Sequence, residues 1–344
     1  MTLLLLPLLA FFLSLGLALY FGPVVIRAAI EYGIVDKPNT PLKTHEQPVA
    51  YLGGLVIFLP LLTTLALALP FEQQTLAVLL AASLVVSVGL IDDLGAMKPR
   101  EKMFGQTVAA LVLVKAGLYI EIATVPTLGA QGLTVFWLLV CMNATNIVDV
   151  SDGLAATSGM VGGGIVTVLA VLQGELPLIL LGATLVGSCG GFWWFNKQPA
   201  RIYLGDTGSM LLGCLLGTSC ILSSFGENVF APMFVPFTIM AIPFFDLALV
   251  IIARLLAKRP ITQGSPDHFA VRMRDAGISP SRITGIAAFF GVVFGALGLT
   301  ATQVTESTAL VVSLCGLAFG VLLIIAVFVR FPSRESPRFT PPSS

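Results

Sequence analysis

The sequence predicts an all-α, polytopic integral membrane protein. Hydrophobic residues make up 56% of the 344 residues and charged residues only 10%, whereas soluble domains carry roughly 25% charged residues. The mean hydropathy is +0.97. Apolar runs recur at about the 20-residue length that spans a bilayer as a helix, without the roughly 10-residue alternation typical of outer-membrane barrels.

We expect about 11 transmembrane helices, each an apolar run bounded by polar residues. They are expected at residues 3–22, 50–70, 75–93, 104–123, 133–148, 153–173, 176–195, 207–224, 229–256, 282–302 and 308–330. The first run follows no basic segment and precedes no small-residue cleavage motif, so we interpret it as a retained helix. Residues 1–330 then form a single transmembrane domain, and the Pro- and Ser-rich residues 331–344 are expected to be a disordered cytoplasmic tail.

Basic residues predict the orientation in the membrane. With 11 spans, every Lys and Arg except Lys115 lies in loops, helix ends or the tail on one side, and the opposite loops contain Glu but no Lys or Arg. Because basic loops face the cytoplasm, the N-terminus is predicted outside and the C-terminus inside, as in an inner (cytoplasmic) membrane. Lys115 is expected within a span, where an ionisable residue is either functional or paired; Asp246 is a candidate partner.

Acidic and amide side chains gather at the predicted cytoplasmic ends of these spans. Asp92 and Asp93 end the third span, and basic residues including Lys102 follow. Adjacent carboxylates repel, so at least one needs a cation partner or a raised pKa. The pair is either a mixed-charge end signal, or a general base or a group that organises phosphate and metal.

The segment NATNIVDVSDG places four polar residues at intervals of three. On a helix this spacing aligns their side chains along one face, which is unusual for a helix end that merely frays into water. The four are Asn143, Asn146, Asp149 and Asp152. They face the same predicted compartment as Asp92, Asp93 and the basic loop that contains His268.

Asp206 lies in the stretch ARIYLGDTGSMLLG, directly before a long apolar run. Flanking glycines permit a close backbone approach, and helix N-termini favour anions such as phosphate. A carboxylate here is either a helix N-cap or a ligand for Mg²⁺, which prefers oxygen donors and bridges phosphates. Taken alone, the stretch favours neither interpretation.

The acidic cluster and the basic loops together indicate phosphoryl chemistry on a lipid phosphate at the membrane surface. Basic loops suit an anionic ligand. A membrane transporter, the alternative from another class, would place ionisable groups near the midplane of the bilayer, where only Lys115 and Asp246 are expected. No feature indicates nucleic-acid binding.

At these residues the sequence resembles the polyprenyl-phosphate N-acetylhexosamine-1-phosphate transferases. The resemblance runs from about residue 36 to residue 285 and rests on five motifs in order: KTHEQPVAYLGG, IDDLG with KMFGQ, NATNIVDVSDGLA, FNKQPARIYLGDTGSMLLG and the loop containing DHF. It implies that polyprenyl (undecaprenyl) phosphate attacks a UDP-N-acetylhexosamine in a reaction that needs Mg²⁺, with Mn²⁺ as an alternative, and releases UMP. A homodimer is expected on the same ground.

The resemblance also implies roles for single residues. Asp206 would bind the metal, and Asp92, Asp93 and His268 would act in catalysis. Substrate-binding positions are Lys43, His45, Lys102, Asn143, Asn146, Asp149, Asp152, Asn196 and Tyr203, of which Tyr203 would stack on uracil.

Two departures bear on the sugar. DHF contains one histidine where the family's branches carry several, and Val150 stands where a glycine usually follows the first aspartate of the NATNIVDVSDG motif. The expected span count favours the branch that transfers GlcNAc-1-phosphate to start a cell-surface glycan. The alternative is the phosphotransferase that uses UDP-MurNAc-pentapeptide in peptidoglycan synthesis.

Overall fold

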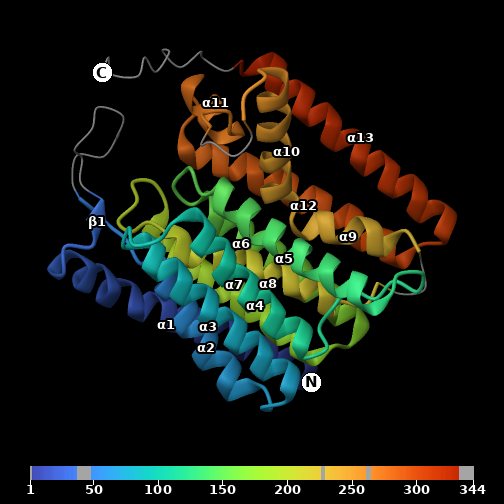
Figure 1. Ribbon diagram of the computed structural model, residues 1–344, viewed down its shortest axis with the longest axis horizontal. Helices are drawn as coiled ribbons and strands as arrows, with labels where there is room; N and C mark the ends of the chain where they lie inside the picture. Colours follow the sequence, from blue (N-terminus) through green and yellow to red (C-terminus); the bar gives the residue numbers. More distant parts are fainter. Residues whose placement is uncertain (1, 37–47, 226–228, 261–264, 333–344) are drawn as a thin grey trace.

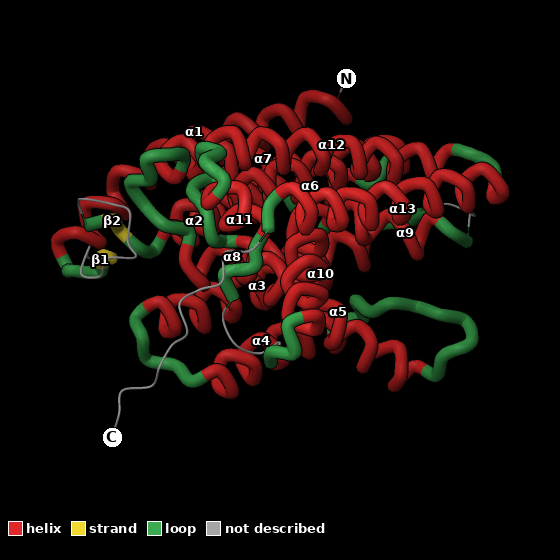
Figure 2. Tube along the Cα trace, turned by 90° about the horizontal axis from the view of Figure 1, so that it is seen from above, coloured by secondary structure: helices red, strands yellow, loops and turns green. Residues whose placement is uncertain are grey.

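The chain forms a helical bundle with one small strand pair. The computed structural model describes residues 2–36, 48–225, 229–260 and 265–332. Its helices are α1 (Thr2–Glu31), α2 (Gly53–Ala68), α3 (Gln73–Asp93), α4 (Pro99–Lys115), α5 (Thr127–Val148), α6 (Leu154–Gln173), α7 (Leu176–Asn196), α8 (Gly205–Leu222), α9 (Ala231–Ile239), α10 (Ala241–Leu256), α11 (Phe269–Asp275), α12 (Pro280–Gln303) and α13 (Glu306–Arg330). Strands β1 (Val35–Asp36) and β2 (Val49–Ala50) pair antiparallel, with Val35 opposite Ala50, at one end of the bundle (Figure 2).

The bundle is that of a multi-pass membrane protein. Within the described residues, eight helices are long and apolar enough to cross a membrane, or nine if the bent pair α9 and α10 counts as one span. Every expected span coincides with a helix or with this pair, but α2 and α4 have only 16 and 17 residues. The count of about 11 spans and the orientation of the termini therefore stay predictions, as do the domain limits.

One expected span is not a continuous helix, and the expected position and partner of Lys115 are wrong. The expected span 229–256 is two helices that meet at Met240 with a bend of 88°. Pro243 lies in the first turn of α10 and has no N–H for the carbonyl of Ile239, which favours a break there. Lys115 is exposed in the last turn of α4 and not in mid-span, and Asp246 bonds His268 instead of Lys115.

Helix α8 lies at the centre of the bundle and α13 at its edge (Figure 1). Within an 18-residue apolar stretch of each helix, 78% of the residues of α8 are buried, but only 11% of those of α13. Glycines allow α2 and α3 to approach the start of α8. A Cβ on Gly54 would lie 2.4 Å from the backbone N of Gly208, and one on Gly89 would lie 2.4 Å from Cα of Thr207. This packing places the first turn of α8 directly beside the end of α3.

Candidate active site

A polar cavity of about 810 Å³ lies where the ends of several helices meet. Residues from β1 and α3 line it together with residues from the segments that join α5 to α6 and α7 to α8. The lining side chains that carry charge or can stack are Asp36, Tyr51, Asp92, Asp93, Asp149, Asp152, Tyr203, Asp206 and Arg274. Six carboxylates against one guanidinium give the cavity wall an excess of negative charge.

Asp93 of α3 caps the first turn of α8. Its Oδ1 accepts the N–H of Asp206 at 2.7 Å, and its Oδ2 accepts the N–H of Thr207 at 3.1 Å and the Thr207 hydroxyl at 2.6 Å. Asp206 is therefore not the N-cap of α8. A carboxylate already takes these N–H groups, which are the anion site of a helix N-terminus, so they are not open to a phosphate.

Gly205 makes this contact possible. Its φ is +71°, a left-handed conformation that side chains other than glycine rarely adopt. A Cβ at this position would lie 2.5 Å from Asp93 Oδ2. The glycine before Asp206 thus allows the carboxylate of Asp93 to reach the backbone of the helix.

Because Asp93 caps α8, the side chain of Asp206 can take part in a charged network. Lys102 Nζ lies 2.9 Å from Asp92 Oδ2 and also forms a salt bridge with Asp206 Oδ2. Asn146 Nδ2 donates to Asp206 Oδ1, and to Ser209 Oγ at 2.9 Å. Four helices, α3, α4, α5 and α8, therefore hold Asp92, Lys102, Asn146 and Asp206 together.

Like Lys102 and Asn146, three more of the expected substrate-binding residues bond the protein itself. Asn196 is buried; its Oδ1 accepts the N–H of Gly153 at 2.9 Å, and its Nδ2 donates to the carbonyl of Ile202 at 2.8 Å. Asp152 Oδ2 accepts the N–H of Ala200 at 3.1 Å. Asn143 donates to Gln106 Oε1 at 2.9 Å and does not line the cavity. Asn196 and Asp152 thus shape the cavity wall, while Asn143 supports it from behind.

Asp149 differs from the other carboxylates of the cavity. It follows the last residue of α5, and burial raises the pKa of its carboxyl to about 7, with the charges of Asp206, Asp93 and Asp152 adding to the rise. Near neutral pH this side chain is therefore divided between its acid and carboxylate forms. It can accept or release a proton where other carboxylates stay ionised.

Two tyrosines form an aromatic part of the wall. The rings of Tyr51 and Tyr203 lie 6.0 Å apart with a tilt of 59°. Burial, followed by nearby carboxylates, raises the pKa of the Tyr203 phenol to about 12 and also raises that of Tyr51. Both phenols stay neutral at physiological pH and offer flat apolar faces to a base.

His268 lies outside the cavity lining. Its ring is buried, with Nδ1 2.7 Å from Asp246 Oδ2, and Asp246 Oδ1 accepts the N–H of Phe269 at 2.9 Å. The pair anchors the start of α11, the short helix that brings Arg274 to the cavity. Here His268 supports the site, and its expected catalytic role stays a prediction.

Sequence reasoning missed Arg274, Tyr51, Asp36 and Gln198, all of which line the cavity. Tyr51 lies within the motif KTHEQPVAYLGG, and Arg274 lies in the basic loop after His268; these two could have been found there. Gln198 lies within the motif FNKQPARIYLGDTGSMLLG and could have been found in the same way, whereas Asp36 carries no such signal. Lys43 and His45 lie outside the described residues.

The donor set fits a Mg²⁺ ion that shares its ligands with a substrate. Among the described residues no three or more His, Cys, Asp or Glu side chains form a closed metal cage. However, Asp92 Oδ2 and Asp206 Oδ2 converge on one cation, Lys102 Nζ, so both can face a positive charge between them. Mg²⁺ in phosphate-transfer sites is commonly held by one or two carboxylates and phosphate oxygens.

Residues 75–224 match the model of glycosyl transferase family 4. That stretch holds Asp92, Asp206 and the NATNIVDVSDG motif. A Bacillus subtilis protein named "Probable undecaprenyl-phosphate N-acetylglucosaminyl 1-phosphate transferase" is 31% identical over 83% of this chain and 82% of its own. The chain belongs to glycosyl transferase family 4.

Other relatives represent both branches of the family. A decaprenyl-phosphate N-acetylglucosaminephosphotransferase of Mycolicibacterium smegmatis is 29% identical over 92% of this chain and 86% of its own. A phospho-N-acetylmuramoyl-pentapeptide-transferase of Campylobacter lari is 29% identical over 62% of this chain and 72% of its own. Family membership and the apolar helices together indicate a multi-pass membrane protein, and its polar cavity lies at the ends of these helices.

Proposed function

We propose that the protein transfers N-acetylhexosamine-1-phosphate, with GlcNAc as the sugar, from a UDP-sugar to polyprenyl phosphate. The observation that carries the proposal is the network of Asp92, Lys102, Asn146 and Asp206 in a polar cavity at the ends of membrane helices. The names of the relatives support the GlcNAc donor. The product would start a lipid-linked cell-surface glycan.

The reaction replaces one phosphoanhydride bond by another. An oxygen of the lipid phosphate bonds the β-phosphorus of the UDP-sugar, the bond from that phosphorus to the bridging oxygen breaks, and UMP leaves with the bridging oxygen. A phosphate monoester has its second pKa near 6 and is already largely dianionic at neutral pH. Positioning and charge neutralisation therefore matter more than a strong base.

The residues of the network supply these functions. Asp206 and Asp92 would hold Mg²⁺, or Mn²⁺ in its place, which neutralises phosphate charge when bound. Lys102 and Arg274 would attract the phosphates, and Asn146 holds Asp206 in its orientation. Tyr203 and Tyr51 offer stacking faces to uracil. Asp149 would take part as an acid or base near pH 7.

The cellular setting follows from the substrates. A cytoplasmic face of the inner membrane would give the site access both to a soluble nucleotide sugar and to a lipid. A homodimer is part of the same proposal. The second candidate donor is UDP-MurNAc-pentapeptide, which the similarity to the Campylobacter lari protein favours.

A transfer assay with purified protein tests the proposal. Radiolabelled UDP-GlcNAc, UDP-MurNAc-pentapeptide or another UDP-N-acetylhexosamine is incubated with polyprenyl phosphate and Mg²⁺, and the lipid product is extracted. We expect labelled lipid and UMP in equal amounts from UDP-GlcNAc and none after EDTA. Product from the pentapeptide donor alone would assign the second candidate, and no product from any donor would refute the phosphotransferase proposal.

A further inference from the structure

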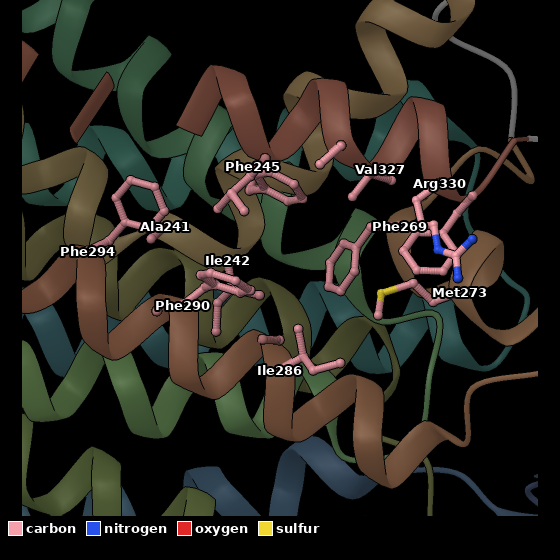
Figure 3. A pocket seen from close by; sticks show the side chains of 15 residues that line it. Ala241, Ile242, Phe245, Phe269, Met273, Ile286, Phe290, Phe294, Val327 and Arg330 are labelled. Carbon is pink, nitrogen blue, oxygen red and sulfur yellow. The ribbon is translucent and has the colours of Figure 1, made fainter. Parts of the chain in front are cut away.

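An apolar cavity of about 220 Å³ separates the outer helix α13 from the rest of the bundle (Figure 3). Its walls come from α10, α11, α12 and α13, and the rings of Phe245, Phe269, Phe290 and Phe294 make up much of the surface. An engineered cavity of roughly 150 Å³ with such walls stays free of water and binds small hydrocarbons. The walls of this cavity therefore suit a hydrocarbon chain better than water.

The cavity extends along α12 and α13. Beyond one end, Phe319 of α13 contacts the rings of Phe290 and Phe294 of α12. At the other end, the guanidinium of Arg272 lies 4.8 Å from the ring centre of Phe328 and donates to the carbonyl of Phe331 at 3.2 Å. The lining residues run from Leu323 to Arg330 on α13 and from Ile286 to Phe294 on α12, helix lengths of about 11 and 12 Å, which lie within the roughly 15 Å of one leaflet.

The cavity can be entered from the bilayer. Ile286, in its wall on α12, is 37% exposed, and Ala326, in its wall on α13, is exposed as well. Only the first half of α13 contains buried residues, the last being Gly316. The second half of α13 contacts the core through partly buried residues such as Ile324, Val327 and Phe328, and the cavity beside them leaves room for a chain.

A positive charge stands at one end of this space. Arg330, in the last turn of α13, lines the cavity and forms no salt bridge with any residue of the described segments. The nearby Arg272 cannot supply this free positive charge, because its guanidinium forms a salt bridge with Asp267 Oδ1 at 3.0 Å. Basic groups between membrane helices near the surface bind anionic lipid head groups.

We propose that this cavity binds an anionic glycerophospholipid, with an acyl chain between α13 and α12 and its phosphate at Arg330. The polyprenyl substrate is disfavoured as occupant because no residue lines both this cavity and the polar one. The two cavities share the helices α11 and α12 as walls. On α11, Phe269 and Met273 face the apolar cavity and Arg274 the polar one, and on α12 Pro280 lines the polar cavity while Ile286 lines the apolar one. The site is independent of the proposed enzymatic activity.

Photolabelling of the full-length protein in lipid nanodiscs tests this site. The probes are phosphatidylglycerol and phosphatidylcholine, each with a diazirine near the end of one acyl chain, and labelled peptides are mapped by mass spectrometry. We expect the phosphatidylglycerol probe to label α12 and α13 at the cavity about fivefold more than the phosphatidylcholine probe. Equal labelling by the two probes would overturn the anionic ligand.

Matched variants test the binding of the acyl chain and the contribution of the Arg330 charge separately. Ala326→Trp, which fills the cavity, should abolish labelling, whereas Val329→Trp, at a residue that is 78% exposed and outside the lining, should not. Arg330→Gln should remove the preference for phosphatidylglycerol, and Arg330→Lys should restore it. Full labelling of Ala326→Trp, or displacement of the probe by equimolar polyprenyl phosphate, would refute the proposal.

Discussion

Asp206 and Asp149 line the same cavity, yet their carboxyl groups have different surroundings. Asp206 bonds Lys102 and Asn146, whereas Asp149 is buried near three other carboxylates and has its pKa raised to about 7. One group is therefore suited to bind a cation, and the other to change its charge near neutral pH. This difference gives a separate prediction for each residue.

Replacing Asp206 by Asn should lower kcat by about 100-fold or more, because a neutral amide cannot balance a cation at the transferred phosphate. Gel filtration and thermal melting should stay close to the wild type. Glu72→Gln, at an exposed residue outside the cavity lining, is the control and should retain full activity. Full activity of Asp206→Asn would remove this residue from the metal site.

Replacing Asp149 by Asn should stabilise the protein without ligands at high pH. A carboxyl whose folded pKa is raised contributes stability that is complete below the unfolded pKa near 4 and is lost as the pH rises through about 7. The upper limit is about 4 kcal/mol, and partial exposure lowers it. We expect a higher Tm for Asp149→Asn at pH 8 and a smaller difference at pH 5. A constant difference across this range would contradict the raised pKa.

At the scale of elements, two connections place the site: the cap of Asp93 on α8 and the anchor of Asp246 on α11. The first joins helices that are far apart in sequence, and the second joins the consecutive helices α10 and α11. In each case a carboxylate accepts N–H groups at the start of a helix. These N–H groups have no carbonyl partner within their own helix. The helix that carries Asp206 and the helix that carries Arg274 are both fixed in this way.

Gly205→Ala should destabilise the protein more than Gly33→Ala. Both glycines have φ of +71°, so both substitutions add comparable backbone strain of about 1–2 kcal/mol, but only a Cβ on residue 205 meets Asp93. Chemical denaturation in detergent gives the difference, and the transfer assay should show reduced kcat for Gly205→Ala alone. Equal effects of the two substitutions would mean that the contact with Asp93 is unimportant.

Replacing Asp246 by Asn should raise KM for the UDP-sugar by about tenfold and change kcat less, because the loss of a charge-assisted bond costs about 1.5 kcal/mol or more and loosens α11 with Arg274. Asp275→Asn, on the exposed side of the same helix, is the matched control. Initial rates over a range of donor concentrations measure both constants. An unchanged KM would show that α11 is held by its other contacts.

At the scale of the whole molecule, the distribution of basic residues predicts the topology. An extracytoplasmic N-terminus and a cytoplasmic C-terminus require an odd number of crossings, and the 11-span prediction requires α2, α4 and the bent pair to cross as well. Fusions of a fluorescent protein that folds only in the cytoplasm should report signal at the C-terminus and none at the N-terminus. An alkaline phosphatase fusion should give the opposite pattern, and two termini on one side would refute the 11-span prediction.

The sequence was sufficient for features that depend on composition and local pattern. Apolar length predicted the helices, because a membrane helix satisfies its own backbone and must be hydrophobic along its whole length. The polar residues of NATNIVDVSDG and the charged GDTGS stretch indicated where the polar site would form. The expected row along one helix face is wrong, because α5 ends at Val148 and Asp149 and Asp152 follow in the connection to α6. The bend at Met240 was missed because the apolar run continues through it.

What only the tertiary structure decided is which side chain bonds which. Asp92 and Asp93 are neighbours in sequence, yet Asp92 pairs with Lys102 while Asp93 caps α8, because successive helical residues point in different directions. Asp246 looked like a partner for Lys115 and bonds His268 instead. Residue types and spacing determined that a site exists and what chemistry suits it. The division of labour among its carboxylates depends on contacts between distant helices, which no local pattern contains.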